Sequence, residues 1–513
     1  MRQELFLVAS LLLGWVAVWP TRRSLDAVLF HCLAMLFGLM TWLGPALLLA
    51  VLGRPWTRVP AIAAAVAFSL LAAALFSLAS RGAAGSPPAA WTFPVAAAAV
   101  GGMAAWQIKQ GFSIVSFDSY GHWAATGIWL SEVGRLEPWI MSGRSFMVPS
   151  WMAAERLFGG VWAGAVFPVL GMVLLLLLAR LLWGGPLSRL PAPARVAVAL
   201  LVPALLAWTV PFRYHALLVH THMAEAVFLL GSVGCLAIAA VERHGEGPSI
   251  APLLAAAGLL AGGFALVRPD GPAYLAVPMG LFAALWLGGA IEAPSAWFWL
   301  PLLVPLWASY GIAFAKLGLW PSGDKLTGAV ALLVIGGLSV IPAVVTALRR
   351  APFAQRAFRR PADVMRLVAA LEAAGLLALL CVKPGNVVAT AGNMAGDLFS
   401  GGGQGFVWYL ASGLLLAAVL FPGIRRRVVF GNAVLFSIVQ FLAVALAVHS
   451  TGHVGRVAMN DSFNRVSFHV LPFVFWYLGA MAGACLGLLL PKAGRLGRGE
   501  GVPDSASPLQ REA

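Results

Sequence analysis

Four polar intervals of this mostly apolar chain carry side chains that could bind a charged substrate or accept a proton. The first interval, residues 109–160, contains Asp118, followed closely by Tyr120 and His122. Carboxylates and imidazoles are common general bases in enzymes, so Asp118 is a candidate base. Asp118 can equally be the N-cap of a short amphipathic helix that lies at a membrane interface. Both interpretations stay open at this point.

The second interval, "RYHALLVHTHMAE", places His220, His222 and Glu225 around the start of a helix. His222 and Glu225 are three residues apart, so they share a helix face that could bind a metal ion. No third ligand follows at a fixed offset, and histidines that only form hydrogen bonds at a membrane interface are commoner. A divalent cation is therefore possible but not supported, and we expect no metal site and no cofactor.

The third and fourth intervals combine basic groups with breaks between apolar segments. In "LVRPDG", Arg268 and Asp270 flank a proline at such a break. Ionisable groups in this position are costly unless they are paired or face a wet cavity, so we interpret them as part of a site rather than a surface turn. In "NRVSFHVLP", Arg465 and His469 precede the last apolar segment. A guanidinium and an imidazole near a helix N-terminus suit the binding of an anion.

The composition of the chain indicates which structural elements connect and position these intervals. The chain has 513 residues, of which 61% are hydrophobic and 10% are charged, and this excludes a water-soluble globular protein. We predict an all-α polytopic membrane protein with about 13–15 transmembrane helices and an interfacial helix in the first large outward loop. The apolar runs lie near 4–20, 27–52, 59–80, 92–108, 161–183, 196–210, 223–241, 250–266, 272–290, 297–315, 326–347, 367–381, 405–421, 429–448 and 465–489.

The distribution of Lys and Arg predicts the orientation of the chain. Basic loops at 180–195, 348–361 and 424–428 are expected on the cytoplasmic side. Alternation of the helices then places all four polar intervals on the outer side. The net charge of +15 is accordingly a signal of topology and of contact with anionic lipid, and nucleic acid is not an expected partner. The outward intervals are 109–160, 211–222, 267–271, 382–404 and 449–464.

Three parts of the chain follow from this pattern. Residues 1–91 are predicted to form N-terminal transmembrane helices. Residues 92–490 are predicted to form the main transmembrane domain, with the outward loop at 109–160. Residues 491–513 are polar and rich in small residues, which is typical of a disordered tail, here on the cytoplasmic side.

The order of these motifs resembles the GT-C superfamily of integral-membrane glycosyltransferases, which includes protein mannosyltransferases and aminoarabinose transferases of lipid A. The resemblance rests on an outward aspartate, then "VPSWMAAERLFGG", then "LVRPDG" and a late "NRVSFHVLP". It covers roughly residues 92–290 and, more loosely, 449–480. Two features depart from the family pattern. Ser119 stands where many members have a second acid, and three extra helices precede the first large loop.

The resemblance implies an enzyme that moves a sugar from a polyprenyl-phosphate donor to a hydroxyl of a lipid, glycan or protein acceptor. Asp118 would be the catalytic base, and Arg268, Arg465 and His469 would bind the donor phosphate. The expected location is a bacterial inner membrane, with the active site facing outward and membrane lipid around it. Two alternatives stay open: a transporter or flippase of a lipid-linked glycan, and a non-catalytic membrane assembly subunit. Substrate-binding or supporting roles fall to Tyr120, His122, His220, His222, Glu225 and Asp270.

Overall fold

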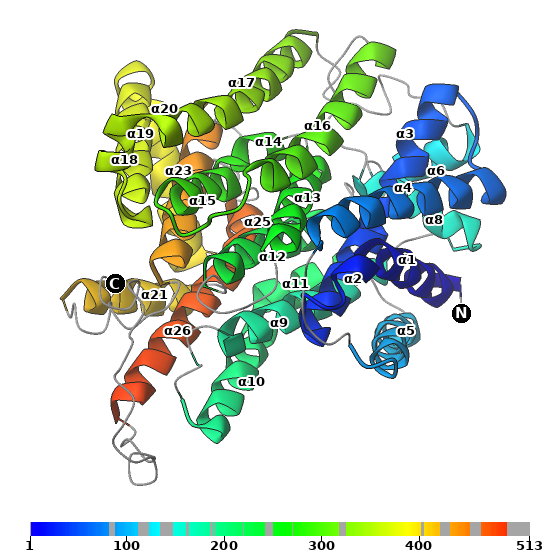
Figure 1. Cartoon of the computed structure of the whole chain (residues 1–513), viewed down its shortest axis with the longest axis horizontal. Coiled ribbons are helices and arrows are strands. Elements are labelled where there is room, and N and C mark those ends of the chain that lie inside the picture. The colour runs from blue at the N-terminus through cyan, green and yellow to red at the C-terminus, as the bar shows by residue number, and fades with distance from the viewer. Residues whose placement is uncertain are drawn as a thin grey trace.

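The protein is a bundle of helices, shown in Figure 1 as a computed structural model. No β-strand occurs among the residues that the structure describes. Eight of their helices are long and apolar enough to cross a membrane, or nine if a bent pair counts as one span. The predicted class, an all-α polytopic membrane protein, is thereby confirmed. The described residues are 2–81, 88–110, 123–133, 147–160, 164–184, 187, 190–218, 220–241, 250–268, 270–317, 325–401, 405–420, 431–451 and 463–489.

Each of the fifteen predicted apolar runs contains at least one helix. The physical reason is that backbone N–H and C=O groups in hydrocarbon have no water to bind and must pair within the segment. The run 27–52 is divided into α2 (Ala27–Thr41) and α3 (Leu43–Leu52), and the run 272–290 begins with the short α14 (Gly271–Tyr274) before α15 (Ala276–Leu287). Four shorter apolar helices among the described residues extend the set of eight toward the predicted 13–15.

The N-terminal helices form one end of the molecule, drawn in blue in Figure 1. Here α1 (Arg2–Val18) crosses α2 very closely. A Cβ atom added to Gly14 would collide with the backbone of Ala34, and one added to Gly38 would collide with the backbone of Ser10. Small residues at a crossing let two membrane helices approach to backbone contact. The neighbouring helices are α4 (Arg58–Ala79) and α5 (Thr92–Gln110).

The first large polar interval contains two short helices, α6 (Ala125–Glu132) and α8 (Met147–Leu157). In the sequence, Tyr120, Trp123, Gly127 and Leu130 fall near one face of the expected interfacial helix, which predicts that this face lies on the membrane surface. Instead this face is inside the protein: Trp123 and Leu130 are buried, and a Cβ on Gly127 would collide with Met152 of α8. The two short helices bury their apolar faces against each other.

The centre of the bundle is α12 (His222–Val241), which is buried along nearly its whole length. It packs between α9 (Val166–Gly184) and α13 (Ala251–Val267), and α13 packs closely against α16 (Ala296–Leu317). The first turn of α12 carries His222 and Glu225. Because the helix is central, these two side chains face protein on all sides.

Two connections differ from simple loops. The span formed by α10 (Ala192–Trp208) and α11 (Val210–Leu217) is bent by 71°. At the bend, the Thr209 hydroxyl caps α11 by accepting the N–H of Phe212, and Pro211 occupies the first turn. The interval 382–404, expected as a connection, is largely helical: it contains α20 (Pro384–Gly396) and a π-helical turn at Asp397–Gly401.

The end of the bundle opposite the N-terminal helices is formed by α18 (Pro352–Ala357), α19 (Pro361–Val382) and α20, which gather there in Figure 1. The last helix begins directly after a 3-10 turn, η5 (Ser467–His469), which follows the four-residue helix α25 (Phe463–Val466). The other helices after α16 are α17 (Lys325–Arg350), α21 (Gly405–Leu420), α23 (Gly431–Thr451) and α26 (Leu471–Leu489).

Intervals that were predicted to share one side of the membrane contact one another. Asn386 Nδ2 donates to Ser450 O at 3.3 Å, which joins the intervals 382–404 and 449–464. At the other ends of the helices, Asp26 forms an ion pair with Arg180. These contacts show only which segments share an end of the bundle. Which side faces outward stays a prediction.

Candidate functional site

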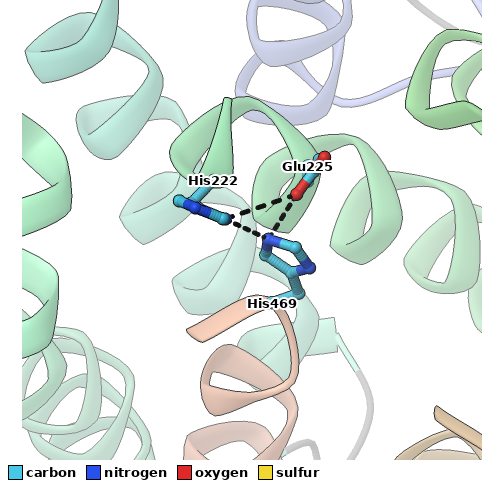
Figure 2. A group of neighbouring side chains, drawn as sticks. All are labelled: His222, Glu225 and His469. Carbon is cyan, nitrogen blue, oxygen red and sulfur yellow. Dashed lines mark hydrogen bonds and ion pairs between the residues drawn. The ribbon is translucent and has the colours of Figure 1, made fainter. Parts of the chain in front are cut away.

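Three side chains from two distant segments converge at the first turn of α12 (Figure 2). His222 Nδ1 lies 2.9 Å from His469 Nε2 and 3.6 Å from Glu225 Oε2. Glu225 Oε2 also contacts His469 Nε2. All three side chains are at most 4% exposed. We call this group the His222–Glu225–His469 trio.

Local structure explains how the trio is presented. The Glu225 N–H donates to Thr221 O at 2.9 Å, so the first turn of α12 begins beside His222. The spacing of three residues then puts His222 and Glu225 on one face, as predicted. His469 ends η5, whose packing against α12 turns the imidazole toward that face.

Arg268 joins the trio to Asp270. It is the C-cap residue of α13 and has an extended backbone. Its Nε and Nη2 atoms donate to the two carboxylate oxygens of Asp270 at 3.0 and 3.2 Å, and Nε lies 3.5 Å from Glu225 Oε1. Two-pronged pairs of this kind fix the guanidinium plane as well as its position. The side chains of Arg268 and Asp270 are 25% and 31% exposed, so this part of the site reaches the surface.

Aromatic rings surround the trio on its histidine side. His220 stacks on His222 with ring centroids 4.4 Å apart, and His215 meets His222 edge-on at 5.1 Å. His220 Nδ1 accepts the N–H of Thr221 at 2.8 Å, which fixes its ring. Trp123 contacts His220 edge-on at 5.9 Å. Through Trp123, the first polar interval reaches the same end of α12.

The structure therefore brings together six of the residues selected from sequence: His220, His222, Glu225, Arg268, Asp270 and His469. Arg465 lies in α25, partly exposed, and acts electrostatically on His215. Asp118, Tyr120 and His122 fall outside the described residues.

The interpretation of the sequence missed two features of the site. One is the meeting of His469 with His222, which are 247 residues apart, because no local spacing signals such a contact. The other is Tyr274, which is buried in α14 and stacks on Phe441 at 4.9 Å. The Tyr274 hydroxyl has no hydrogen-bond partner among the described residues. The sequence signal that could have indicated Tyr274 is its position in the same Pro/Gly break as Arg268.

The fold and the trio define a multi-pass α-helical membrane protein with a buried polar site at the ends of its helices. Comparisons of the chain with models of known families, with curated proteins and with solved structures each find no match. The functional argument therefore depends on the geometry of the site. Its chemistry includes two carboxylates, one guanidinium and a group of buried imidazoles, which can bind an anion, relay a proton or ligate a metal ion.

Glu155 is a buried carboxyl group in α8, a helix too short to cross a membrane. Burial raises the pKa of Glu155 to about 9, against a smaller opposing effect of Gln3. The folded protein thus keeps this group protonated at neutral pH. In the unfolded chain the pKa is about 4.3, so the stability that Glu155 contributes is complete below about pH 4 and is lost as pH rises toward 9.

We therefore expect the parent protein in detergent to become less stable between pH 5 and 8, by roughly 4 kcal/mol from this group. Glu155→Gln should flatten that dependence, because an amide does not ionise. Thermal unfolding at a series of pH values measures the effect, with Glu132→Gln as control because that carboxylate is exposed. An equal pH dependence in the parent and in Glu155→Gln would show that Glu155 is ionised in the folded protein.

Proposed function

We propose that the protein is a membrane glycosyltransferase, which moves a sugar from a polyprenyl-phosphate donor to an acceptor hydroxyl on the outer side of a bacterial inner membrane. The observation that carries the proposal is the position of Arg268. The Arg268 side chain is partly exposed at a break between apolar helices, and Asp270 and Glu225 both contact its Nε. A lipid-linked phosphate would meet a basic group at this depth while its hydrocarbon tail stays in the bilayer.

The reaction needs stabilisation of the departing phosphate. Negative charge builds on the phosphate oxygens as the bond to the sugar carbon breaks, and a preorganised guanidinium stabilises it through charge-assisted hydrogen bonds. The two-pronged contact with Asp270 provides that preorganisation for Arg268. Arg465 and His469 are the further phosphate-binding groups in this proposal.

A proton acceptor must serve the acceptor hydroxyl, and Asp118 has this role in the proposal. The contact of Trp123 with His220 supports it, since Trp123 follows Asp118 closely in the chain and lies at the same end of α12 as Arg268. His220 and His222 then line the path between the first polar interval and the donor site. Tyr120 and His122 would contribute to binding the sugar or the acceptor.

The depth of the polar cluster favours transfer over transport. Transporters bind substrate near the middle of the bilayer, at discontinuous helices. Here His222 and Glu225 belong to the first turn of α12, and Arg268 follows the last residue of α13. A polar site at helix ends suits a reaction between a lipid headgroup and an acceptor at the membrane surface.

The experiment that tests the function is a donor panel. The purified protein is placed in lipid vesicles with radiolabelled polyprenyl-phosphate sugars and an extract of acceptors. We expect one label to move to the acceptor with release of polyprenyl phosphate, whereas nucleotide sugars, which lack the lipid carrier, should give no transfer. Movement of an intact lipid-linked sugar across the vesicle membrane without transfer would instead identify a flippase.

A further inference from the structure

The trio has the geometry of ligands that converge on one point. Glu225 Oε2 is buried and forms ion-pair contacts with His222 Nδ1 and His469 Nε2, but it receives no directed hydrogen bond from any described residue. A carboxylate oxygen in such a place normally receives an N–H or a cation, because burying it without one is costly. In Figure 2, His222 Nδ1, His469 Nε2 and Glu225 Oε2 all point into the same space.

We propose that His222, Glu225 and His469 bind a divalent transition-metal ion, and that zinc fits the site best. Two histidines and one glutamate form a known type of catalytic zinc site, which keeps a fourth position for another ligand. Ligands in a tetrahedral zinc site with bonds of 2.0–2.1 Å are about 3.3 Å apart. The separations of His222 Nδ1 from the other two ligand atoms, 2.9 and 3.6 Å, lie on either side of that value, whereas the contact between Glu225 Oε2 and His469 Nε2 is shorter.

Neighbouring side chains would hold the ligands in position. Glu225 faces the trio through Oε2 and faces Arg268 through Oε1, at 3.5 Å from Nε, so the guanidinium orients the carboxylate. Asp270 in turn fixes Arg268. The stacked ring of His220 limits rotation of His222. Outer contacts of this kind orient metal ligands and tune their affinity.

The charges of the site give the ion a role. Arg268 is paired with two carboxylates, Glu225 and Asp270, so these three groups together carry a formal charge of −1, which weakens the attraction of the guanidinium for an anion. A bound divalent ion would reverse the sign and attract a phosphate beside Arg268. This role in phosphate binding rests on the proposed function, whereas binding of the metal itself does not.

The test measures metal binding by the full-length protein in detergent, without any substrate. After treatment with a chelator, Zn²⁺ affinity is determined by competition with a chromophoric chelator, and Co²⁺ is added to record the absorption spectrum of the bound ion. We expect about one ion per chain and Co²⁺ bands typical of a four-coordinate nitrogen and oxygen site. Elemental analysis of the untreated protein identifies the ion that it carries from the cell.

Substitutions of the trio residues test whether they are the metal ligands. His469→Ala and Glu225→Gln should each weaken Zn²⁺ binding by more than about 10²-fold, beyond the 10- to 100-fold loss that is typical of outer partners. The matched control is His31→Ala: this histidine lies in α2, bonded to Thr92, and its loss should leave the affinity unchanged. Glu225→Asp keeps the charge and serves as a second variant if Glu225→Gln does not fold.

A folded parent protein that binds no Zn²⁺ below millimolar concentration would overturn the metal site. So would unchanged affinity in folded His469→Ala and Glu225→Gln or Glu225→Asp. Tight binding of Zn²⁺ together with sugar transfer that a chelator does not slow would leave the metal site in place and overturn only its role in phosphate binding. Failure of the donor panel alone leaves the result for metal binding intact.

Discussion

Asp118→Asn is expected to lower the rate of sugar transfer by about 10²-fold or more, with the protein still folded and abundant in membranes. Asparagine keeps the shape of the side chain and an oxygen that can cap a helix, so a structural cap should lose about 1 kcal/mol or less. If Asp118 is the general base, the same substitution should abolish its function, because the amide cannot accept the proton of the acceptor hydroxyl. Initial rates with saturating labelled donor measure the difference.

The control for this substitution is Asp363→Asn. Asp363 lies in the first turn of α19 and accepts the N–H of Arg360, so it is an aspartate with a capping role. We expect its variant to transfer sugar at the parental rate. If Asp118→Asn is as active as Asp363→Asn, then Asp118 is only a helix cap, and the proposed base must be sought elsewhere.

Arg268→Lys is expected to lower transfer by about 10²-fold, the usual cost of losing one preorganised donor to a transition-state anion. Lysine keeps the positive charge but not the planar fork, so it cannot hold both oxygens of Asp270 and face a phosphate together. The turnover number should therefore fall even at saturating donor. Steady-state rates over a range of donor concentrations separate this loss from weaker binding.

Arg366→Lys is the matched control for Arg268. Arg366 also pairs with an aspartate, Asp363, but its side chain is 77% exposed on α19. Exposed ion pairs contribute little, and this one lies far from the trio in the sequence, so we expect unchanged transfer. Parental activity in Arg268→Lys would show that charge alone suffices and that the contact with Asp270 has no part in the reaction.

The sequence alone determined the class of the protein and the local parts of the site. Long apolar runs must become helices in a membrane, since the backbone has no other partner for its hydrogen bonds. The three-residue spacing of His222 and Glu225 fixes a shared helix face. The pairing of Arg268 with Asp270 is also local, because only one residue separates them. Each of these conclusions depends on neighbours in the chain.

Tertiary structure alone decided which helix ends meet. His469 reaches His222 and Glu225 across a separation of 247 residues from His222, and Arg268 reaches Glu225 from another helix end. The sequence lacked a third ligand beside His222 and Glu225, so it could not support a metal site. The apolar face of α6 likewise packs against α8, where its pattern alone suggested the membrane surface. A hydrophobic pattern in the sequence indicates that a helix face is buried. Whether lipid or another helix covers that face depends on how the helices pack in three dimensions.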